Sequence, residues 1–236
     1  MYKKILVTGG AGFIGTNFLL YMVPRYPEVT FINLDKLSYA SDLGNLKEIS
    51  KRQNYFFIWG DISESDTVNR VMRDNVEAVV NFAAESYAGN SIASPQNFIT
   101  SNITGCFNLL EAARKFKVKK FLQVSTGDVY GSLGRDGYFT ESSPLKPNNP
   151  YSASKAAADC LVRSYHKTYG LNVNIARSGN NYGPFQHWEK FIPSVIYSAL
   201  RDEPVVIYGD GQQVRDWIFV QDHCRALEMI LLHGRE

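Results

Sequence analysis

Short apolar runs alternate with longer amphipathic stretches over most of the 236 residues. The apolar runs predict buried strands, and the stretches between them, where apolar residues recur three or four positions apart, predict helices. The strands are expected near Lys4–Thr8, Thr30–Leu34, Tyr55–Ile58, Ala78–Phe82, Lys120–Ser125 and Asn172–Ala176. The helices are expected near Gly12–Val23, Leu43–Ser50, Ser65–Asp74, Ile99–Lys115 and Ser152–Tyr169. Because strands and helices take turns, we predict an α/β fold, a Rossmann-type doubly wound parallel sheet, as one domain over residues 1–176.

The pattern changes after Arg177, where a polar turn over residues 178–184 interrupts the alternation. The remaining elements are expected to be a helix near Ile192–Leu200, a strand near Val205–Tyr208, a short strand near Trp217–Val220 and a helix near Asp222–Leu232. They are too few to build a core of their own. We therefore expect residues 177–236 to form a small, partial substrate-binding subdomain, a lid over the carboxyl ends of the strands.

Glycines fill the turn between the first strand and the first helix, which reads Gly9-Gly10-Ala11-Gly12-Phe13-Ile14-Gly15. Glycine permits the tight turn, lets the backbone approach a pyrophosphate, and allows the helix to pack close to the strand. The first N–H groups of that helix are then free to face the phosphates. This arrangement predicts a dinucleotide site, and a turn that binds nothing is the weaker explanation.

Acidic residues follow the next two strands. Asp35 ends the second strand at the spacing of a carboxylate that holds both ribose hydroxyls of NAD and repels a 2′-phosphate, although the adjacent Lys36 weakens the case against NADP. Asp61 follows the third strand, where it can either reach the adenine edge or cap the next helix. The residues expected to bind the cofactor, NAD, are Gly9, Gly12, Phe13, Ile14, Gly15, Asp35, Lys36, Asp61, Ile62, Ala83, Tyr151 and Lys155.

The sharpest catalytic signal is Tyr151-Ser152-Ala153-Ser154-Lys155 at the start of a predicted helix. Residues four apart share a helix face, so Lys155 lies beside Tyr151. Its ammonium group and the positive nicotinamide are expected to lower the pKa of the phenol from about 10 toward neutrality. The tyrosinate can then take a proton from a substrate hydroxyl while the attached carbon gives its hydride to NAD. Ser125 or Thr126 can hydrogen-bond the same hydroxyl.

Composition narrows the class of protein. The net charge is +2 and the Lys and Arg residues are scattered, which argues against nucleic acid or an anionic membrane as the main partner. The three cysteines are far apart and match no metal-binding spacing, so we expect reduced thiols, no metal and a cytoplasmic protein. The first strand begins at Lys4, which leaves no room for a signal peptide, and no apolar run approaches the length of a membrane span.

Several blocks carry a resemblance to a known family. They are the glycine-rich turn, Asn81-Phe82-Ala83-Ala84-Glu85-Ser86, the Tyr151–Lys155 segment, Asn180-Asn181-Tyr182-Gly183-Pro184, Glu189-Lys190-Phe191-Ile192-Pro193, and Tyr208-Gly209-Asp210-Gly211 with Val214-Arg215-Asp216-Trp217. Through them the chain resembles the extended short-chain dehydrogenase/reductase family, the NAD-dependent epimerases and dehydratases, and within it most of all the dTDP-glucose 4,6-dehydratases.

The resemblance implies a lyase of carbohydrate biosynthesis that acts on a nucleotide-diphosphate hexose. It implies a homodimer formed through helices near Ile99–Lys115 and Ser152–Tyr169, and further strands and helices after Gly234-Arg235, so that the substrate subdomain looks truncated. The substrate-binding residues that it implies, with the two cations facing the diphosphate, are Glu85, Thr126, Asn180, Lys190, Tyr208 and Arg215.

One block departs from the family. Its members carry Thr-Asp-Glu after the fifth strand, and this chain has Thr126-Gly127-Asp128. In the family reaction the tyrosine and NAD oxidise C4 of the sugar, the Glu removes the C5 proton, the Asp protonates the leaving C6 hydroxyl, and the hydride returns to C6. Gly127 carries no acid, and Asp128 is shorter than Glu by one C–C bond of about 1.5 Å. Glu85 or Tyr87 could supply a replacement acid.

We expect a 4,6-dehydratase whose catalytic residues are Thr126, Asp128, Tyr151 and Lys155. Because the acid/base pair is altered to Gly127 and Asp128, the alternative is an epimerase or 4-oxidoreductase of the same family that does not dehydrate its substrate. A non-catalytic NAD-binding protein is the third reading, and the intact Tyr151 and Lys155 argue against it.

Overall fold

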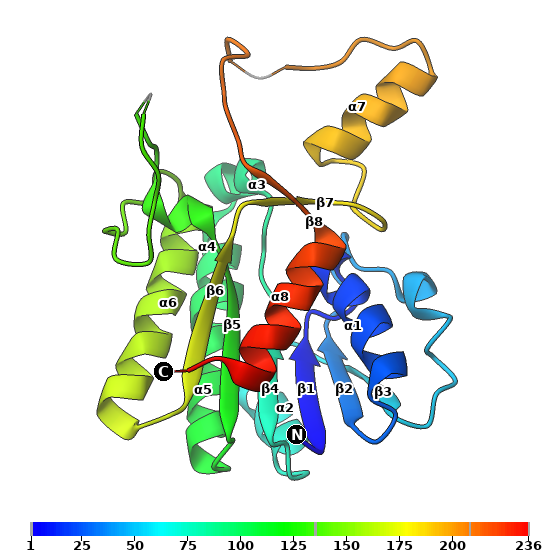
Figure 1. Ribbon diagram of the computed structural model, residues 1–236, viewed down its shortest axis with the longest axis vertical. Helices are drawn as coiled ribbons and strands as arrows, with labels where there is room; N and C mark the ends of the chain where they lie inside the picture. The colour runs from blue at the N-terminus through cyan, green and yellow to red at the C-terminus, as the bar shows by residue number, and fades with distance from the viewer. Residues whose placement is uncertain (1, 135, 208, 236) are drawn as a thin grey trace.

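The computed structural model describes residues 2–134, 136–207 and 209–235. Its centre is a sheet in which every neighbouring pair of strands is parallel, in the order β3-β2-β1-β4-β5-β6 (Figure 1). The strands are β1 (Lys4–Thr8), β2 (Thr30–Asp35), β3 (Tyr55–Trp59), β4 (Ala78–Asn81), β5 (Lys120–Thr126) and β6 (Val173–Ser178). This strand order confirms the predicted Rossmann-type fold.

Helices cover both faces of the sheet, because successive side chains of a strand point to opposite faces. In β1, Ile5 and Val7 pack under α1 (Phe13–Arg25) and α8 (Val220–His233), while Leu6 faces the opposite layer. That second layer consists of α2 (Ser65–Met72), α5 (Gly105–Lys115) and α6 (Pro150–Tyr169). Each face therefore has its own apolar core, as the near-continuous hydrophobic strands require.

α8 differs from the expected lid. Its residues Val220, Cys224, Leu227 and Leu231 are fully buried in the core that α1 shares. Glu228 ties the two helices together, because it accepts hydrogen bonds from Tyr21, at 2.6 Å, and from Tyr26, and pairs with Arg25 at 2.9 Å. α8 is thus part of the Rossmann layer, although it comes last in the chain.

The remaining elements lie around the carboxyl ends of the strands (Figure 1). They are η1 (Leu43–Leu46), α3 (Ala88–Ala93), α4 (Pro95–Phe98), the π-helical turn η2 (Ile99–Thr104), η3 (Gly127–Tyr130), β7 (Asn180–Tyr182), α7 (Phe191–Leu200) and β8 (Trp217–Phe219), which pairs with β7. The helix predicted near Leu43–Ser50 is reduced to the 3₁₀ turn η1. In the described part of the chain no helix is both long and apolar enough to cross a membrane.

The strand predicted near Val205–Tyr208 does not form at residues 205–207, and Tyr208 lies outside the described residues. Val206 and Ile207 are more than 60% exposed. Apolar β-branched residues favour a strand only where a neighbouring strand and a core accept them.

Candidate functional site

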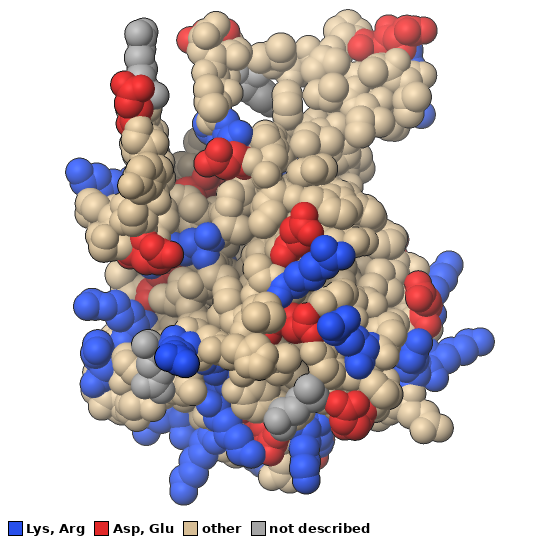
Figure 2. All heavy atoms as spheres, viewed as in Figure 1, with Lys and Arg blue, Asp and Glu red and all other residues tan. Residues whose placement is uncertain are grey.

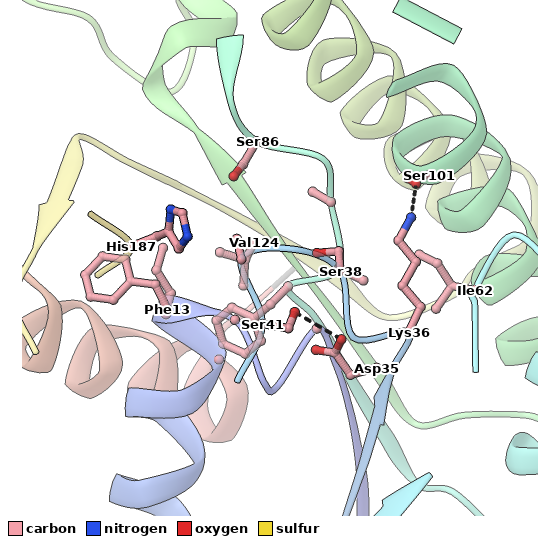
Figure 3. Close-up of a pocket in the computed structure, with 18 of the residues that line it drawn as sticks. Phe13, Asp35, Lys36, Ser38, Ser41, Ile62, Ser86, Ser101, Val124 and His187 are labelled. Atoms are coloured by element: carbon pink, nitrogen blue, oxygen red, sulfur yellow. Dashed lines mark hydrogen bonds between the residues drawn. The ribbon is translucent and has the colours of Figure 1, made fainter. Parts of the chain in front are cut away.

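A cleft opens where the strands of the main sheet end at their carboxyl edge (Figure 3). Every residue predicted to bind the cofactor lines it, from the glycine turn after β1 to Tyr151 and Lys155 of α6. Segments far apart in sequence meet here because parallel strands all present their carboxyl ends at one edge. The other lining residues, which the prediction did not include, are Leu34, Ser38, Ala40, Ser41, Gly60, Phe82, Ala84, Ser86, Ser101, Val124, Ser125, Gln186, His187 and Lys190.

The glycine turn is shaped to receive a phosphate group. Gly9 has a φ of +69°, and a Cβ atom there would lie 2.6 Å from the backbone nitrogen of Ala83. A Cβ at Gly12 would meet only the Gly9 carbonyl oxygen, at 3.4 Å, so its cleft side is open. α1 begins directly after Gly12 with no side-chain cap, which leaves the N–H groups of its first turn available to an anion. The residues present therefore fit a dinucleotide pyrophosphate.

Asp35 connects the glycine turn to the loop that follows β2. One carboxylate oxygen accepts from the Ala11 N–H at 2.9 Å, and the other accepts from the Leu37 N–H at 2.8 Å and from the Ser41 hydroxyl at 3.3 Å (Figure 3). A carboxylate offers about four acceptor positions. Asp35 can therefore shape both loops and still accept from a ribose hydroxyl.

Lys36 is engaged by acidic residues from two other strand ends. Its Nζ lies 3.0 Å from Glu85 and 3.6 Å from Asp61, and it donates to Ser101 at 3.0 Å. Burial lowers the pKa of Lys36, but Glu85 and Asp61 raise it by more, so it stays above its usual value. Because both carboxylates neutralise this cation, it offers little to a 2′-phosphate, and the site favours NAD over NADP.

Of the two roles left open for Asp61, helix capping is not found, because the N-cap of α2 is Glu64, and the contact with adenine stays a prediction. Its Oδ1 accepts from the Ser63 N–H at 2.8 Å, which organises the turn before α2, and its side chain also lines the cleft. Asp61 and Glu85 both pair with Lys36. Both carboxylates therefore lie near the end of the cleft that is expected to hold the adenosine. The implied contact of Glu85 with substrate thus competes with a contact to Lys36.

α6 presents Tyr151 and Lys155 to the cleft from its first two turns. The helix is fixed at this point by a capping box, in which Asn149 accepts from the Ser152 N–H at 2.8 Å and Ser152 accepts from the Asn149 N–H at 3.2 Å. Lys155 is 4% exposed, and its Nζ donates to the Val124 carbonyl at 2.7 Å. An ammonium group has three donors, so two remain for a ligand in the cleft.

The expected lowering of the pKa of Tyr151 is not found in the protein alone. Burial raises this pKa, and the nearby charge of Asp128 raises it further, while a hydrogen bond with Thr126 lowers it. Lys155 is not among the groups that shift this pKa, and burial lowers its own pKa. The helix spacing therefore predicted the pair correctly but not the balance of charge around it.

Thr126, Asp128 and Tyr151 meet at the end of β5. The Asp128 N–H donates to the Thr126 hydroxyl at 3.2 Å, which starts the 3₁₀ turn η3 and leaves the Asp128 side chain exposed. At Gly127 a Cβ atom would have the Ser178 carbonyl oxygen as its nearest neighbour, at 3.3 Å. A side chain could be accommodated there after a shift of a few tenths of an ångström.

The residues implied to bind substrate are not all brought together. Lys190 reaches the cleft, where its Nζ donates to the Ser86 carbonyl at 3.3 Å and lies 5.1 Å from the centre of the Tyr87 ring. Asn180 lies on β7, and Arg215 is exposed in the segment before β8, away from the residues that line the cleft. Tyr208 lies outside the described residues.

Contacts beside the cleft hold the segments that line it, and sequence reasoning missed these contacts. The Tyr39 hydroxyl donates to Glu189 at 3.0 Å, which links the loop after β2 to the segment before α7. His187 lies beside Phe13 (Figure 3), and its Nδ1 is buried with no hydrogen-bond partner among the described residues. The Asn102 side chain holds the backbone of Glu85. Its Oδ1 accepts from the Glu85 N–H at 2.8 Å, and its Nδ2 donates to the Glu85 carbonyl at 3.1 Å. Tyr39 and His187 lie in irregular segments, and the helical pattern that contains Asn102 does not predict its contact with Glu85.

Comparison with known proteins agrees with this geometry. The family model described as GDP-mannose 4,6 dehydratase matches residues 6–236. A dTDP-glucose 4,6-dehydratase of Xanthomonas campestris pv. campestris is 49% identical over 98% of this chain and 68% of its own length. The crystal structure of a dTDP-glucose 4,6-dehydratase from Bacillus anthracis in complex with NAD is 47% identical, with a TM-score of 0.91 over 98% of this chain and 72% of that one.

Epimerases are more distant in sequence. The structure of a UDP-glucuronic acid 4-epimerase from Bacillus cereus, in complex with UDP-glucuronic acid and NAD, has a TM-score of 0.91 but is only 30% identical, over 98% of this chain and 74% of that one. The fold is thus shared across activities, while sequence favours the dehydratases. From the match over residues 6–236, the chain belongs to the GDP-mannose 4,6 dehydratase family.

Proposed function

We propose that the protein is an NAD-dependent nucleotide-sugar 4,6-dehydratase, a carbon–oxygen lyase that acts on dTDP-glucose or a closely similar nucleotide hexose. The observation that carries this proposal is the Tyr151–Lys155 pair at the end of a cleft lined by the whole predicted dinucleotide set. The greater identity to dehydratases, 49% against 30% for the epimerase, separates this activity from its nearest alternative.

The glycine turn, Asp35 and the free donors of Lys155 hold the cofactor, and bound NAD supplies a hydride acceptor. Tyr151 removes the proton of the sugar C4 hydroxyl, and Thr126 hydrogen-bonds the same oxygen. Asp128, beside Tyr151, is the base for the C5 proton, and its carboxyl would pass that proton to the C6 hydroxyl, which leaves as water. Return of the hydride to C6 and a proton from solvent at C5 would complete the product. Lys190 balances the charge of the substrate diphosphate at the other end of the cleft.

The test is the mass of the product. The protein is incubated with NAD and with dTDP-, UDP- or GDP-glucose in separate reactions, and the nucleotide sugars are analysed by mass spectrometry. Loss of one water from dTDP-glucose is the expected result. The absence of water loss from all three substrates would contradict dehydration.

The alternative function, 4-oxidation or epimerisation without dehydration, is favoured by Gly127, which offers no acid to the C6 hydroxyl. The discriminating variant carries Gly127→Asp and Asp128→Glu together, and the first change requires the Ser178 carbonyl, 3.3 Å from the new Cβ, to shift by a few tenths of an ångström. If this variant alone dehydrates dTDP-glucose, the natural protein performs the alternative reaction. Its product then keeps the substrate mass, or NADH accumulates.

We further propose a cytoplasmic homodimer that pairs η2, α5 and α6 with their mates. Ile99 and Phe107 on the first two of these elements are 47% and 44% exposed, and α6 offers a face with the small exposed residues Ala153 and Cys160. Apolar and small side chains at a helix face suit close packing between helices. Light scattering on the eluted protein is expected to give twice the chain mass, and Phe107→Glu is expected to give the monomer.

A further inference from the structure

We propose that Asp159 is a positioning residue of the reaction, the buried counter-ion that keeps Lys155 charged and in place, with Arg177 holding the Asp159 carboxylate. This inference rests on the proposed function, because it assigns the support of the Tyr151–Lys155 pair. It concerns residues that no motif in the chain singles out.

The three residues share one face of α6. Tyr151, Lys155 and Asp159 follow one another at intervals of four, so each lies about one helical turn beyond the last. Asp159 is 1% exposed and lies on the side of the helix that packs against the sheet. A charged side chain is rarely buried to this degree unless it is paired.

Arg177 supplies the pair from the neighbouring strand. β6 runs parallel to β5 with Arg177 opposite Ser125, directly beneath the site. The Arg177 Nε donates to Asp159 Oδ2 at 2.8 Å, its Nη1 donates to the Tyr130 hydroxyl at 2.9 Å, and the guanidinium lies 5.1 Å from the centre of the Tyr130 ring. A guanidinium fixed on two sides cannot follow Asp159 if that side chain moves, so it sets the position of the carboxylate.

The second carboxylate oxygen points to the role. Asp159 Oδ1 and the Ser125 hydroxyl are both buried, and Ser125 stabilises the charged carboxylate by lowering the pKa of Asp159, which burial raises. Arg177 and Lys155 lower this pKa as well. The charge of Asp159 acts in turn on Lys155, whose Nζ donates to the Val124 carbonyl.

Charge at Asp159 opposes the effect of burial on Lys155. Burial lowers the pKa of the ammonium, and Asp159 and Cys106 raise it. The charged and titratable groups that surround this cluster come from each element packed against it, namely Tyr151 on α6, Cys106 on α5, Arg177 on β6, and Asp128 and Tyr130 on η3. Asp159 also raises the pKa of Tyr151. Loss of its charge therefore lowers the pKa of both members of the pair.

A buried ion pair is a poor device for stability, because desolvation offsets most of the attraction. A structural role predicts that Asp159→Asn changes only the melting temperature. A positioning role predicts a change in protonation as well. The matched control is Glu228→Gln, the same carboxylate-to-amide change at a buried, Arg-paired residue on α8, which is 7% exposed and belongs to the α1 contact.

The first measurement does not require activity. Lysine labelled with ¹³C at Cε is incorporated in the full chain, the Lys155 signal is assigned with Lys155→Arg, and its titration is followed by NMR. In Asp159→Asn we expect the Lys155 midpoint to fall by roughly one pH unit, and in Glu228→Gln we expect no change. Asp159→Glu, which keeps the charge, should restore most of the shift and serves as the test if the Asn variant does not fold.

The second measurement follows NADH formation in a single turnover over a range of pH. Both limbs of the profile are expected to move to lower pH in Asp159→Asn, because both pKa values fall, and to stay in place in Glu228→Gln. The proposal is overturned if Lys155 titrates at the wild-type midpoint in folded Asp159→Asn and at the same midpoint in Asp159→Glu. If the wild-type protein forms no NADH while the NMR shift is present, the proposed function fails and the assignment of Asp159 stands.

Discussion

The two walls of the cleft are built differently. α6, which carries Tyr151 and Lys155, has eight buried residues and a capping box at its start. α7, which follows the cleft residue Lys190 and contributes no lining residue of its own, has no buried residue along its ten positions. Figure 2 shows charged side chains interspersed over the lower part of one face and a largely uncharged surface over α7. The chemical wall is fixed by the core, and the recognition wall is fixed by a few polar contacts.

This difference separates reaction from recognition. Tyr151, Thr126 and Asp128 keep their relation through helix, strand and turn geometry, so they are in place before a ligand arrives. Lys190 is held by a hydrogen bond to the Ser86 carbonyl, by the Tyr87 ring and by a 3.9 Å ion pair with Glu189. Changes on the first wall should therefore alter rate, and changes on the second should alter affinity.

Tyr151→Phe should give the largest effect, because it removes the proposed base from the rigid wall and leaves its packing. The ring lies 6.2 Å from that of Phe98, and this contact needs no hydroxyl. We expect NADH formation to fall by about 10²–10⁴-fold, with a melting temperature near that of the wild type. Single-turnover absorbance and thermal unfolding measure the two quantities. A variant that retains most of its rate would assign the base to another residue.

Gly9→Ala should come next, and it tests the turn that both walls share. The residue needs a φ of +69°, and an added Cβ would lie 2.6 Å from the Ala83 nitrogen. We expect a loss of about 2–4 kcal/mol of unfolding free energy and no measurable NAD binding by calorimetry. Gly12→Ala is the matched control, because its Cβ would lie 3.4 Å from its nearest neighbour, the Gly9 carbonyl oxygen. This variant should unfold like the wild type while binding NAD more weakly.

The predictable part of the molecule is the part governed by repeating patterns. The strands followed from apolar runs because buried parallel strands need them, and the Tyr151–Lys155 pair followed from the spacing of a helix. The glycine turn was predictable because position 9 has a positive φ and no space for a Cβ atom, and only glycine meets both conditions. In each case one local rule decides the conformation.

Contacts between loops follow no such rule. Tyr39 and Glu189 are 150 positions apart, and Lys36 meets Glu85 only because β2 and β4 end at the same edge. The place of α8 was missed for a similar reason: its pattern predicts an amphipathic helix, but not that Glu228 pairs with α1. The pKa of Tyr151 needed the burial of its surroundings, which no single segment contains.

Glu228→Gln should show how firmly α8 is joined to α1. Burial raises the pKa of Glu228, but Tyr21, Tyr26 and Arg25 lower it by more, so it lies below its usual value. A lowered carboxyl pKa stabilises the fold above the unfolded-state pKa, and this stability is lost as pH falls through the folded-state pKa. We expect a cost of about 1–3 kcal/mol at pH 7.

The cost should shrink as the pH is lowered through the acidic range in which Glu228 becomes protonated. Urea unfolding of both proteins at pH 7 and at successively lower pH measures this. A difference in stability that does not depend on pH would mean that packing, rather than charge, joins the helices. Tyr26→Phe tests one donor alone and should cost less than the loss of the carboxylate.

Tyr39→Phe should have the smallest effect, and it tests the recognition wall directly. It removes the 3.0 Å hydrogen bond to Glu189 and leaves the ring, which lies 5.6 Å from His187. Tyr39 is 53% exposed, so water replaces the lost bond and the melting temperature should not change. We expect dissociation of NAD and of the nucleotide sugar to accelerate by about 2–10-fold, the value of one hydrogen bond of about 0.5–1.5 kcal/mol.

Stopped-flow release of NADH measures this rate, and Tyr138→Phe is the control, since that hydroxyl belongs to a ring that is 82% exposed and outside the cleft. If Tyr39→Phe instead lowers the rate of hydride transfer and leaves release unchanged, the contact acts on the geometry of the chemical wall. The contrast between the two walls would then not hold, because a polar contact between loops would be setting the position of the reacting groups.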